Sequence, residues 1–386
     1  MKYVSVFALT YGLLLVGVAP AADSLNVRLV GTRDTPGKAL GVCVVGSYAY
    51  VADDTSGLRV ISVADPAHPT DVGFFDTPAR AGYVSVVGDK AYVADGPSGL
   101  RIISVADPAH PVEVGSIDTR YWANSVAVGG NYAYVTDVDS GLVVISVADP
   151  AHPTEMGHMK IPSSAIRVAV AGNYAYVTAY DSGLRVISIA DPSSPREVGR
   201  VRTQGRAGGL ALSGDHAYVV DDDNGLRVIS IVDPANPVEI GSYHVPGMAS
   251  GVALRADYAY LTDLYNGLRV ISVADPAHPT QVGYHDAPGW IYGVAADGGQ
   301  VYVAGYEAGL LVYQFYGSGV EEGPRPSQLA SREPAATLAG NLPAGAAAFD
   351  AMGRRMVNPG SGIYFVRSTV GRESSAVSVR KVMILK

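Results

Sequence analysis

The sequence predicts an all-β protein: a ring of seven four-stranded blades, followed by a small C-terminal β-sandwich-like domain. The first observation is a set of seven tyrosines spaced 42 residues apart, each second in a short apolar run: Tyr50, Tyr92, Tyr134, Tyr176, Tyr218, Tyr260 and Tyr302. A fixed period of about 40–50 residues is typical of propellers and repeat arrays. The second observation is that glycine and Asp-Pro signals divide each repeat into four short apolar runs.

One complete repeat can be followed between residues 80 and 118. Strands are expected over 81–87, 91–95, 100–106 and 112–118, separated by a Gly-Asp-Lys turn, a Ser-Gly loop and an Asp-Pro-Ala-His-Pro turn. Glycine and Asp-Pro pairs punctuate strands at such spacings, and proline cannot donate to a β ladder. The third strand is apolar on both faces, as expected for a sheet packed between two others.

The number of strands in each repeat predicts how the ring closes. First, second and third strands occur seven times, whereas a fourth strand follows only six of them, and repeat seven lacks the Asp-Pro turn. One orphan strand with the sequence of a fourth strand lies at residues 26–34. We therefore expect it to complete the last blade, since pairing protects both exposed edges. The alternative, an open solenoid, needs distinct capping repeats.

Composition narrows the class of partner. The net charge is −8, so no basic surface indicates nucleic acid or anionic lipid. The single Cys43 excludes an internal disulfide and a multi-cysteine zinc site. We expect no cofactor, no metal and no nucleic-acid partner.

The N-terminus has the pattern of a secretory signal peptide. Lys2 precedes an apolar run, and small residues at 19–22 provide a cleavage site. We predict a signal at 1–21, the propeller at 24–316, a Gly/Glu/Pro/Ser-rich linker at 317–334 and the C-terminal domain at 335–386. The alternative is an uncleaved anchor, although the apolar run is short for a membrane span; no transmembrane helix is expected in the mature protein.

The repeat resembles a known family. Leu-Arg-Val-Ile-Ser-Val-Ala-Asp-Pro-Ala-His-Pro, at 58–69 and 268–279, is similar to the LVIVD repeat of bacterial and archaeal cell-surface proteins. The resemblance covers residues 26–315 and implies a surface-exposed β-propeller. It implies no general catalytic motif or ligand.

The last fifty or so residues resemble a second family. Strand-like runs are expected at 346–350, 362–367 and 376–385. The segments 349–355, 362–367 and the final Arg-Lys-Val-Met-Ile-Leu-Lys are similar to the C-terminal sorting domain of type IX secretion substrates. The resemblance implies export to the outer cell surface, with the secretion machinery as a partner. The alternative is a small β-sandwich without that role.

Three polar residues recur with the same 42-residue period as the seven tyrosines, which are called here the ladder; each recurring residue is called a column. The first is an aspartate that closes the second strand, read as a cap on the loop that follows it rather than as a metal ligand: Asp53, Asp95, Asp137, Asp221 and Asp263. The second is the histidine of the Asp-Pro turn, for which a turn role is expected. The third is an arginine that is expected to pair with nearby acids: Arg59, Arg101, Arg185, Arg227 and Arg269.

The candidate site consists of residues that the repeat does not keep. In a four-stranded blade, the fourth-to-first and second-to-third connections emerge on one face, and positions there vary from repeat to repeat. We expect this face to carry the candidate ligand-binding residues Lys38, Arg80, Tyr121, Trp122, Arg206, Trp290 and Tyr292, joined by Tyr180, Tyr265, Tyr306 and Glu307. Exposed aromatics with arginines are favoured at binding surfaces. The alternative is unselected loop drift.

These observations lead to a functional hypothesis. The chain is expected to be a secreted, surface-displayed binding or scaffold module for a protein or glycan. No nucleophile, phosphate-loop or zinc-protease pattern is present, and no catalytic residue is predicted. The alternative is an extracellular enzyme, for example one acting on polysaccharide, with its site at the channel mouth.

Overall fold

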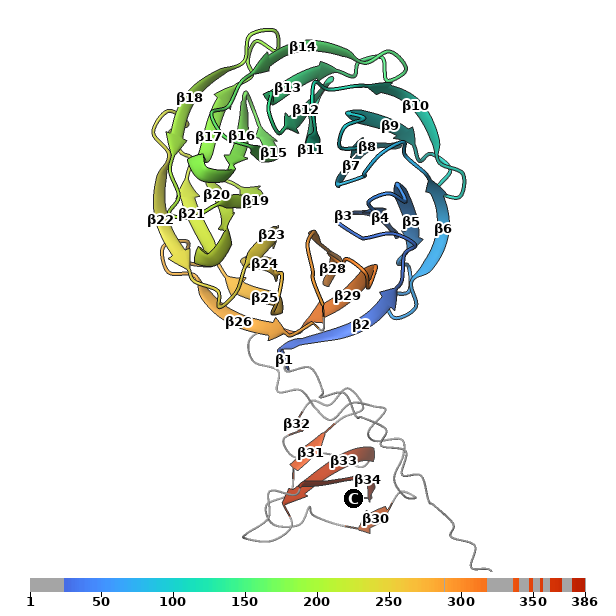
Figure 1. The fold of residues 1–386 in the computed structure, drawn as a ribbon. Helices are drawn as coiled ribbons and strands as arrows, with labels where there is room; N and C mark the ends of the chain where they lie inside the picture. Colours follow the sequence, from blue (N-terminus) through green and yellow to red (C-terminus); the bar gives the residue numbers. More distant parts are fainter. Residues whose placement is uncertain are drawn as a thin grey trace, which may run out of the picture.

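The computed structural model describes residues 24–287 and 289–317, together with strands between residues 336 and 385. Seven sheets stand around a central axis like the blades of a propeller (Figure 1). The predicted signal peptide, and the predicted linker beyond residue 317, lie outside the described residues.

Each of the first six blades is built from four consecutive strands, with the first strand innermost. Blade 1 comprises β3 (Gly41–Val45), β4 (Tyr48–Ala52), β5 (Leu58–Ser62) and β6 (Thr70–Phe75). Blade 2 comprises β7 (Tyr83–Val87), β8 (Lys90–Ala94), β9 (Leu100–Ser104) and β10 (Val112–Ile117). Blade 3 comprises β11 (Ala123–Gly129), β12 (Tyr132–Asp137), β13 (Gly141–Ser146) and β14 (Thr154–Met159).

The next three blades repeat this order. Blade 4 comprises β15 (Ala165–Ala171), β16 (Tyr174–Ala179), β17 (Gly183–Ser188) and β18 (Arg196–Val201). Blade 5 comprises β19 (Ala207–Ser213), β20 (His216–Asp221), β21 (Leu226–Ser230) and β22 (Val238–Tyr243). Blade 6 comprises β23 (Ala249–Arg255), β24 (Tyr258–Asp263), β25 (Gly267–Ser272) and β26 (Thr280–His285). Two short 3-10 turns, η1 (Tyr180–Ser182) and η2 (Asp222–Asn224), lie in second-to-third loops.

Blade 7 joins the two ends of the ring, as predicted. Its first three strands are β27 (Val294–Asp297), β28 (Gln300–Ala304) and β29 (Leu310–Phe315), and its outer strand is the N-terminal β2 (Val27–Arg33). β2 pairs antiparallel with β29, with Val27 opposite Phe315 and Arg33 opposite Leu310 (Figure 1). The orphan strand of the sequence therefore closes the ring.

The two residues before β2 form an element that the sequence did not reveal. β1 (Ser24–Leu25) adds a fifth strand to the outside of blade 6, and the chain passes to blade 7 through Asn26 at φ 56°. The reason lies in the glycine of each outer strand. A Cβ on Gly73 would stand 2.4 Å from the carbonyl oxygen of Pro108 in the next blade's Asp-Pro turn. Repeat seven has no such turn, and the Leu25 carbonyl takes its place against Gly283.

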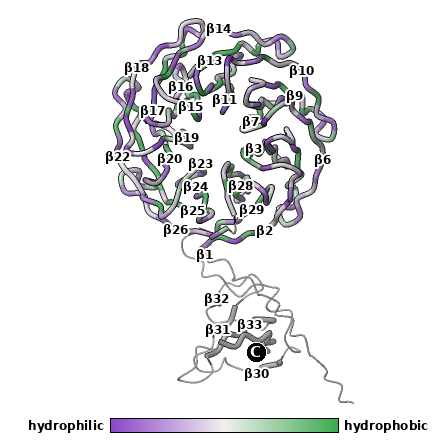
Figure 2. Tube along the Cα trace, viewed as in Figure 1, coloured by the Kyte–Doolittle hydropathy of each residue, from purple (hydrophilic) through white to green (hydrophobic). Residues whose placement is uncertain are grey.

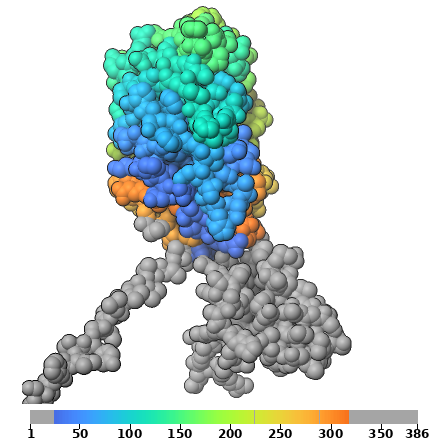
Figure 3. All heavy atoms as spheres, turned by 90° about the vertical axis from the view of Figure 1, so that its right-hand side faces the viewer, coloured from blue at the N-terminus to red at the C-terminus, as the bar shows by residue number. Residues whose placement is uncertain are grey.

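The core lies between neighbouring blades. The ladder tyrosines are at most 6% exposed, and each packs against the first and second strands of the next blade; Tyr302 of blade 7 packs against Val42 and Val51 of blade 1. Second and third strands are almost wholly buried, whereas outer strands alternate with exposed residues, and the rim carries much of the hydrophilic sequence (Figure 2). Seen edge-on, residues of blades 1 to 3 form much of the side of the ring that faces the viewer (Figure 3).

Three of the described C-terminal strands, at 347–349, 362–369 and 377–385, overlap the strand-like runs that the sequence predicted, whereas those at 336–339 and 355–356 were not predicted. The described strands are β30 (Ala336–Ala339), β31 (Ala347–Phe349), β32 (Arg355–Met356), β33 (Gly362–Thr369) and β34 (Val377–Leu385). They form one five-stranded sheet in the order β30-β34-β33-β31-β32, with β30 parallel to β34. The β-sandwich-like character and sorting role stay predictions.

Candidate functional site

One face of the propeller carries the fourth-to-first and second-to-third loops, called here the loop face. Backbone bridges join the second-to-third loop of one blade to the fourth-to-first loop of the next, at Tyr306–Ala39, Asp54–Ala81 and Gly96–Ala123. Through these bridges blades 7, 1, 2 and 3 present a continuous, hydrogen-bonded edge.

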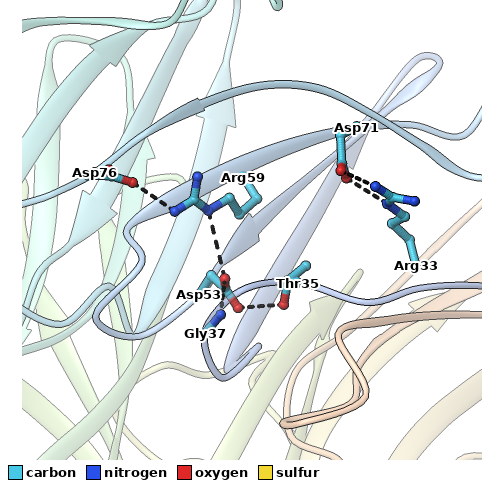
Figure 4. Close-up of polar contacts among 7 residues, drawn as sticks. All are labelled: Arg33, Thr35, Gly37, Asp53, Arg59, Asp71 and Asp76. Carbon is cyan, nitrogen blue, oxygen red and sulfur yellow. Dashed lines mark hydrogen bonds and ion pairs between the residues drawn. The ribbon is translucent and has the colours of Figure 1, made fainter.

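The repeated aspartate holds these loops in place. In blade 1, Asp53 accepts hydrogen bonds from the Thr35 hydroxyl (2.6 Å) and the Gly37 backbone N–H (2.8 Å), and lies 3.8 Å from Arg59 Nε (Figure 4). Arg59 also donates to Asp76 at 2.7 Å. Blade 2 repeats the arrangement with Asp95, which is likewise fully buried.

The predicted role of this aspartate as a cap on the following loop is right for part of the column only. Asp263 accepts from the backbone N–H groups of Tyr265 and Asn266, and Asp137 from that of Ser140, in the loops that follow. Asp137 also accepts from the Tyr121 backbone N–H before the first strand, and in blades 1, 2 and 5 the carboxylate holds the equivalent loop, because that loop folds back over the end of the second strand. The column thus fixes the loops that carry the variable residues.

Burial sets the electrostatics of this network. Desolvation raises the pKa of the Asp53 and Asp95 carboxyls, while the hydrogen bonds from Thr35 and Thr77 and the nearby arginines oppose the rise. Because the carboxylates lie in protein rather than in water, their charge depends on these partners.

The other two columns have the predicted structural roles. Histidine Nδ1 lies 2.8 Å from the turn aspartate at His68–Asp65 and His110–Asp107, on the exposed rim opposite the loop face. The column arginines pair with acids, for example Arg185 with Glu197 at 3.1 Å.

Variable side chains of the fourth-to-first loops follow a common geometry on the loop face. Several rest on the first residue of the preceding blade's second-to-third loop. Lys38 Nζ lies 4.7 Å from the Tyr306 ring centroid, Arg80 Nε bonds Asp54 at 2.6 Å, and a Cβ on Gly96 would stand 3.2 Å from the Trp122 ring. Arg206 likewise lies 5.2 Å from the Tyr180 ring centroid. The ring therefore orders these residues side by side.

Tyr306 gathers the largest group, called here the aromatic cluster: Lys38, Tyr265, Trp290, Tyr292 and Tyr306. Ring centroids of Trp290 and Tyr292 lie 5.4 and 5.5 Å from that of Tyr306, and Tyr265 is 6.5 Å from Trp290. A hydrogen bond with the Tyr306 side chain is the main cause that raises the pKa of Lys38. Tyr265 and Trp290 are 60% and 47% exposed, so the cluster faces solvent.

The backbone at Tyr306 is strained. Its φ is 53°, a left-handed conformation that bulky residues rarely adopt, whereas blade 2 has Gly96 at the equivalent position with φ 52°. Such strain costs on the order of 1 kcal/mol and is concentrated at functional sites. The aromatic ring is thus present where glycine fits the backbone better.

The remaining predicted residues form separate groups. Arg80, held by Asp54, lies 5.9 Å from the Trp122 ring centroid. Arg206 lies between Tyr180 and Asp222, 3.8 Å from the latter. Tyr121 borders a cavity of about 520 Å³ between blades 3 and 4. The loop face therefore divides the seven predicted residues among neighbouring clusters rather than one.

Sequence reasoning missed one residue of the innermost strands. The Arg167 guanidinium of β15 lies 4.7 Å from the Tyr83 ring centroid of β7, two blades away, so this contact crosses the channel side of blade 3. Arg167 also donates to the Asn124 carbonyl at 3.5 Å, and burial lowers its pKa. The signal was available, because four of the seven repeats have glycine at this position.

Within the described residues, no group of three or more His, Cys, Asp or Glu side chains is placed to hold a metal ion. The same part of the chain contains no helix long and apolar enough to cross a membrane.

Comparisons with known proteins agree with the architecture. The closed ring with four-stranded blades defines a seven-bladed β-propeller. The model of the LVIVD repeat matches residues 36–77, 79–119, 122–160, 162–203, 204–245 and 246–286. These matches cover more than half of the chain, which belongs to the LVIVD-repeat family. Blade 7 lies beyond the matched residues.

Solved structures with similar folds are distant in sequence. The RRP9 WD40 repeats match with a TM-score of 0.63 at 12% identity, covering 76% of this chain and 99% of that one. The computationally designed Ika8 protein matches with a TM-score of 0.58 at 8% identity, covering 74% and 99%. These likenesses show the fold alone. No curated protein matches the sequence.

Proposed function

We propose that this propeller is an exported, surface-displayed binding or scaffold module, and that its ligand contacts the loop face. The observation that carries the proposal is the aromatic cluster around Tyr306, in which four rings and one lysine meet in a solvent-facing group. Rigid aromatics next to a cation are the residues that dominate binding energy at protein surfaces. The N-terminal signal pattern and the C-terminal resemblance to sorting domains support the export part of the proposal.

Two acids of the loop face, outside the aromatic cluster, favour a binding role over the alternative polysaccharide-active enzyme. Asp54 holds Arg80, and Asp222 lies beside Arg206, so both carboxylates are engaged in positioning basic side chains. A paired-carboxylate mechanism needs two carboxyl groups separated by about 5–10 Å across a substrate. The ligand class we propose is a protein or glycan at the outer cell surface.

The test is retention of ligands by the purified chain and three variants. Solubilised surface proteins and an array of glycans are screened against Trp290→Ala, Trp122→Ala and Tyr306→Gly. We expect Trp290→Ala and Tyr306→Gly to weaken retention at least about tenfold, because both remove rings from one cluster. Trp122→Ala reports the neighbouring Arg80 group and should have a smaller effect.

Two controls make the result interpretable. Tyr306→Gly relieves the positive-φ backbone, so loss of retention without loss of stability separates binding from folding. Val232→Ala changes a residue that is 69% exposed beside the Asp233 turn, away from the loop face, and should retain every ligand. Unchanged retention of every ligand by Trp290→Ala and Tyr306→Gly would sink the assignment.

A further inference from the structure

A cavity of about 880 Å³ opens between blades 6 and 7 beside the aromatic cluster. Leu29, Ala287, Gly305 and Leu311 are among its lining residues, together with Trp290 and Tyr306 of the aromatic cluster. Seven copies of the same unit occur in the chain, so the other blades show what ordinarily fills this space.

In blade 1 the space holds a polar network. Its members are Thr35, Asp53, Arg59 and Asp76, which Figure 4 shows together. Six repeats further on, the equivalents of the first three members are Ala287, Gly305 and Leu311; the equivalent of Asp76, one repeat earlier, is Asp34. Three of these four side chains are shorter or apolar, and only the last keeps its charge. The outer-strand acid Asp71 is likewise replaced by Leu29 in blade 7. The cavity is the volume that the threonine, aspartate and arginine occupy elsewhere.

Blade 4 has lost part of the same network in a different way. It also lacks the aspartate, with Ala179 in its place, but Ile161 replaces the threonine and is only 4% exposed. Arg185 remains there and bonds Glu197. In blade 7 the arginine itself is replaced by Leu311, so the space is lined by short and apolar side chains that favour an apolar group over a polar one.

Charge at the rim indicates the chemistry of the occupant. Asp34 is the equivalent of Asp76 and Asp118, which bond Arg59 and Arg101 in their blades, but position 311 offers it leucine instead of arginine. Glu307 is the second carboxylate at the rim. Among the described lining residues there is no lysine or arginine. Glu307 also helps to raise the pKa of Lys38, so Asp34 is the carboxylate left to an incoming cation.

We propose that this cavity binds a cationic group on an apolar stem, an amine or guanidinium, in the place that the column arginine occupies in other blades. The stem lies against Leu29 and Leu311, and the charged end meets Asp34 beside the rings of Trp290 and Tyr306. Aromatic faces attract such cations, and an apolar floor disfavours a polyhydroxy ligand. The inference rests on the proposed binding function and specifies one of its contacts.

The experiment uses Trp290 as the reporter. Trp122→Phe leaves it as the single tryptophan, and its fluorescence is followed during titration with 4-phenylbutylamine, 4-phenylbutan-1-ol or 4-phenylbutyrate. We expect the amine to bind about tenfold more tightly than the alcohol, and the carboxylate to bind most weakly. Equal or tighter binding of the carboxylate, or no binding of the amine and of the peptide described below, overturns the proposal.

Two variants locate the binding. Ala287→Thr, Gly305→Asp and Leu311→Arg combined rebuild the blade 1 network and should abolish amine binding. Leucine must be replaced together with glycine, because a Cβ on Gly305 would stand 2.9 Å from the Leu311 side chain. Asp34→Asn changes only an exposed charge and should lower the amine affinity to that of the alcohol; this variant decides the question if the triple variant does not fold. Amine binding unaffected by Asp34→Asn overturns the proposal.

A second arm distinguishes the source of the cation. The peptide acetyl-Gly-Arg-Phe-Gly-amide and its Gln-for-Arg analogue are titrated in the same way. Arginine-dependent peptide binding supports a protein partner, and amine binding alone supports a small molecule. If neither the amine nor the arginine peptide binds while ligands are still retained through Trp290, this inference falls and the proposed function stands. If ligand retention does not depend on Trp290 while amine binding persists, the proposed function falls and the amine site stands.

Discussion

Blades 1 and 7 share one backbone plan and differ in what holds their loop-face ends. Blade 1 ties its fourth-to-first loop to a buried aspartate, and Arg59 spans from that aspartate to Asp76 on the outer strand. Blade 7 has Gly305 and Leu311 at these positions, and an open cavity results. The comparison teaches that the repeated apolar residues are sufficient to form the four strands. The polar network is an additional feature, which blade 7 lacks while keeping the same fold.

The largest expected effect comes from removing the strand that makes blade 7 a blade. Deletion of residues 24–34 should lower the free energy of unfolding by on the order of 5 kcal/mol, because Val27 and the β2–β29 ladder are lost. Urea denaturation followed by circular dichroism measures the change. A chain that starts at residue 26 lacks only β1 and should be affected far less. A chain without 24–34 that is as stable as the parent contradicts the closure.

The second-largest expected effect comes from changing the aspartate of blade 1, in comparison with its equivalent Gly305 in blade 7. Asp53→Ala leaves the Thr35 hydroxyl, the Gly37 N–H and part of the Arg59 charge without their acceptor, and should cost about 3 kcal/mol. Gly305→Ala in blade 7 places its Cβ 2.9 Å from the flexible Leu311 side chain and 3.2 Å from the Gly309 carbonyl oxygen, and should cost less than Asp53→Ala, about 1 kcal/mol. Chemical denaturation of both variants gives the difference. Similar losses would mean that blade 7 depends on this position as blade 1 does.

The smallest effect is in the pH dependence of stability. Burial raises the pKa of Asp53 and Asp95, so their contribution is present below the ordinary aspartate pKa and is lost as pH rises through the raised value. Hydrogen bonds from His68 and His110 lower the pKa of the exposed Asp65 and Asp107, so their contribution is lost as pH falls through the lowered value.

The two sets of aspartates can therefore be separated by titration. Between about pH 2.5 and 6, the urea midpoint of Asp53→Asn/Asp95→Asn should rise with pH more steeply than that of the parent, and that of Asp65→Asn/Asp107→Asn less steeply. Parallel curves for all three proteins would show that neither set is linked to folding.

Much of the fold could be predicted because its signals are periodic. The ladder tyrosines set the number of blades, and the orphan strand at 26–34 had one place left to pair. β1 was missed because a strand of two residues shows no repeating pattern. Repeat seven lacks the Asp-Pro turn, but the sequence does not indicate which residues take the place of that turn. Short-range signals began the first strand of blade 2 two residues too early: Ala81 bridges Asp54 of blade 1 instead of pairing within its own sheet.

The candidate site was less accessible to sequence reasoning. The seven predicted residues could be placed on one face from strand order alone. Their division into clusters depends on which loop each side chain rests on, and that follows from the ring. The cavity needed Leu29 to be recognised as a neighbour of Leu311, although these residues stand at opposite ends of the repeat array. Gly305 stands in the sequence where other repeats have the column aspartate, but the consequence of that change depends on the pairing of β2 with β29.

The β2–β29 pairing also sets the order in which the molecule can be completed. Arg28 bonds Gln314 across 286 residues of chain, so the first strand to be synthesised has no partner until the last blade has emerged. Contacts of such sequence separation form late and slow folding. The cavity between blades 6 and 7 takes Leu29 and Asp34 from that first segment and Leu311 from the last strand, so it exists only in a finished propeller. A chain interrupted during synthesis or export would carry six blades and most of the loop face, yet would lack this cavity.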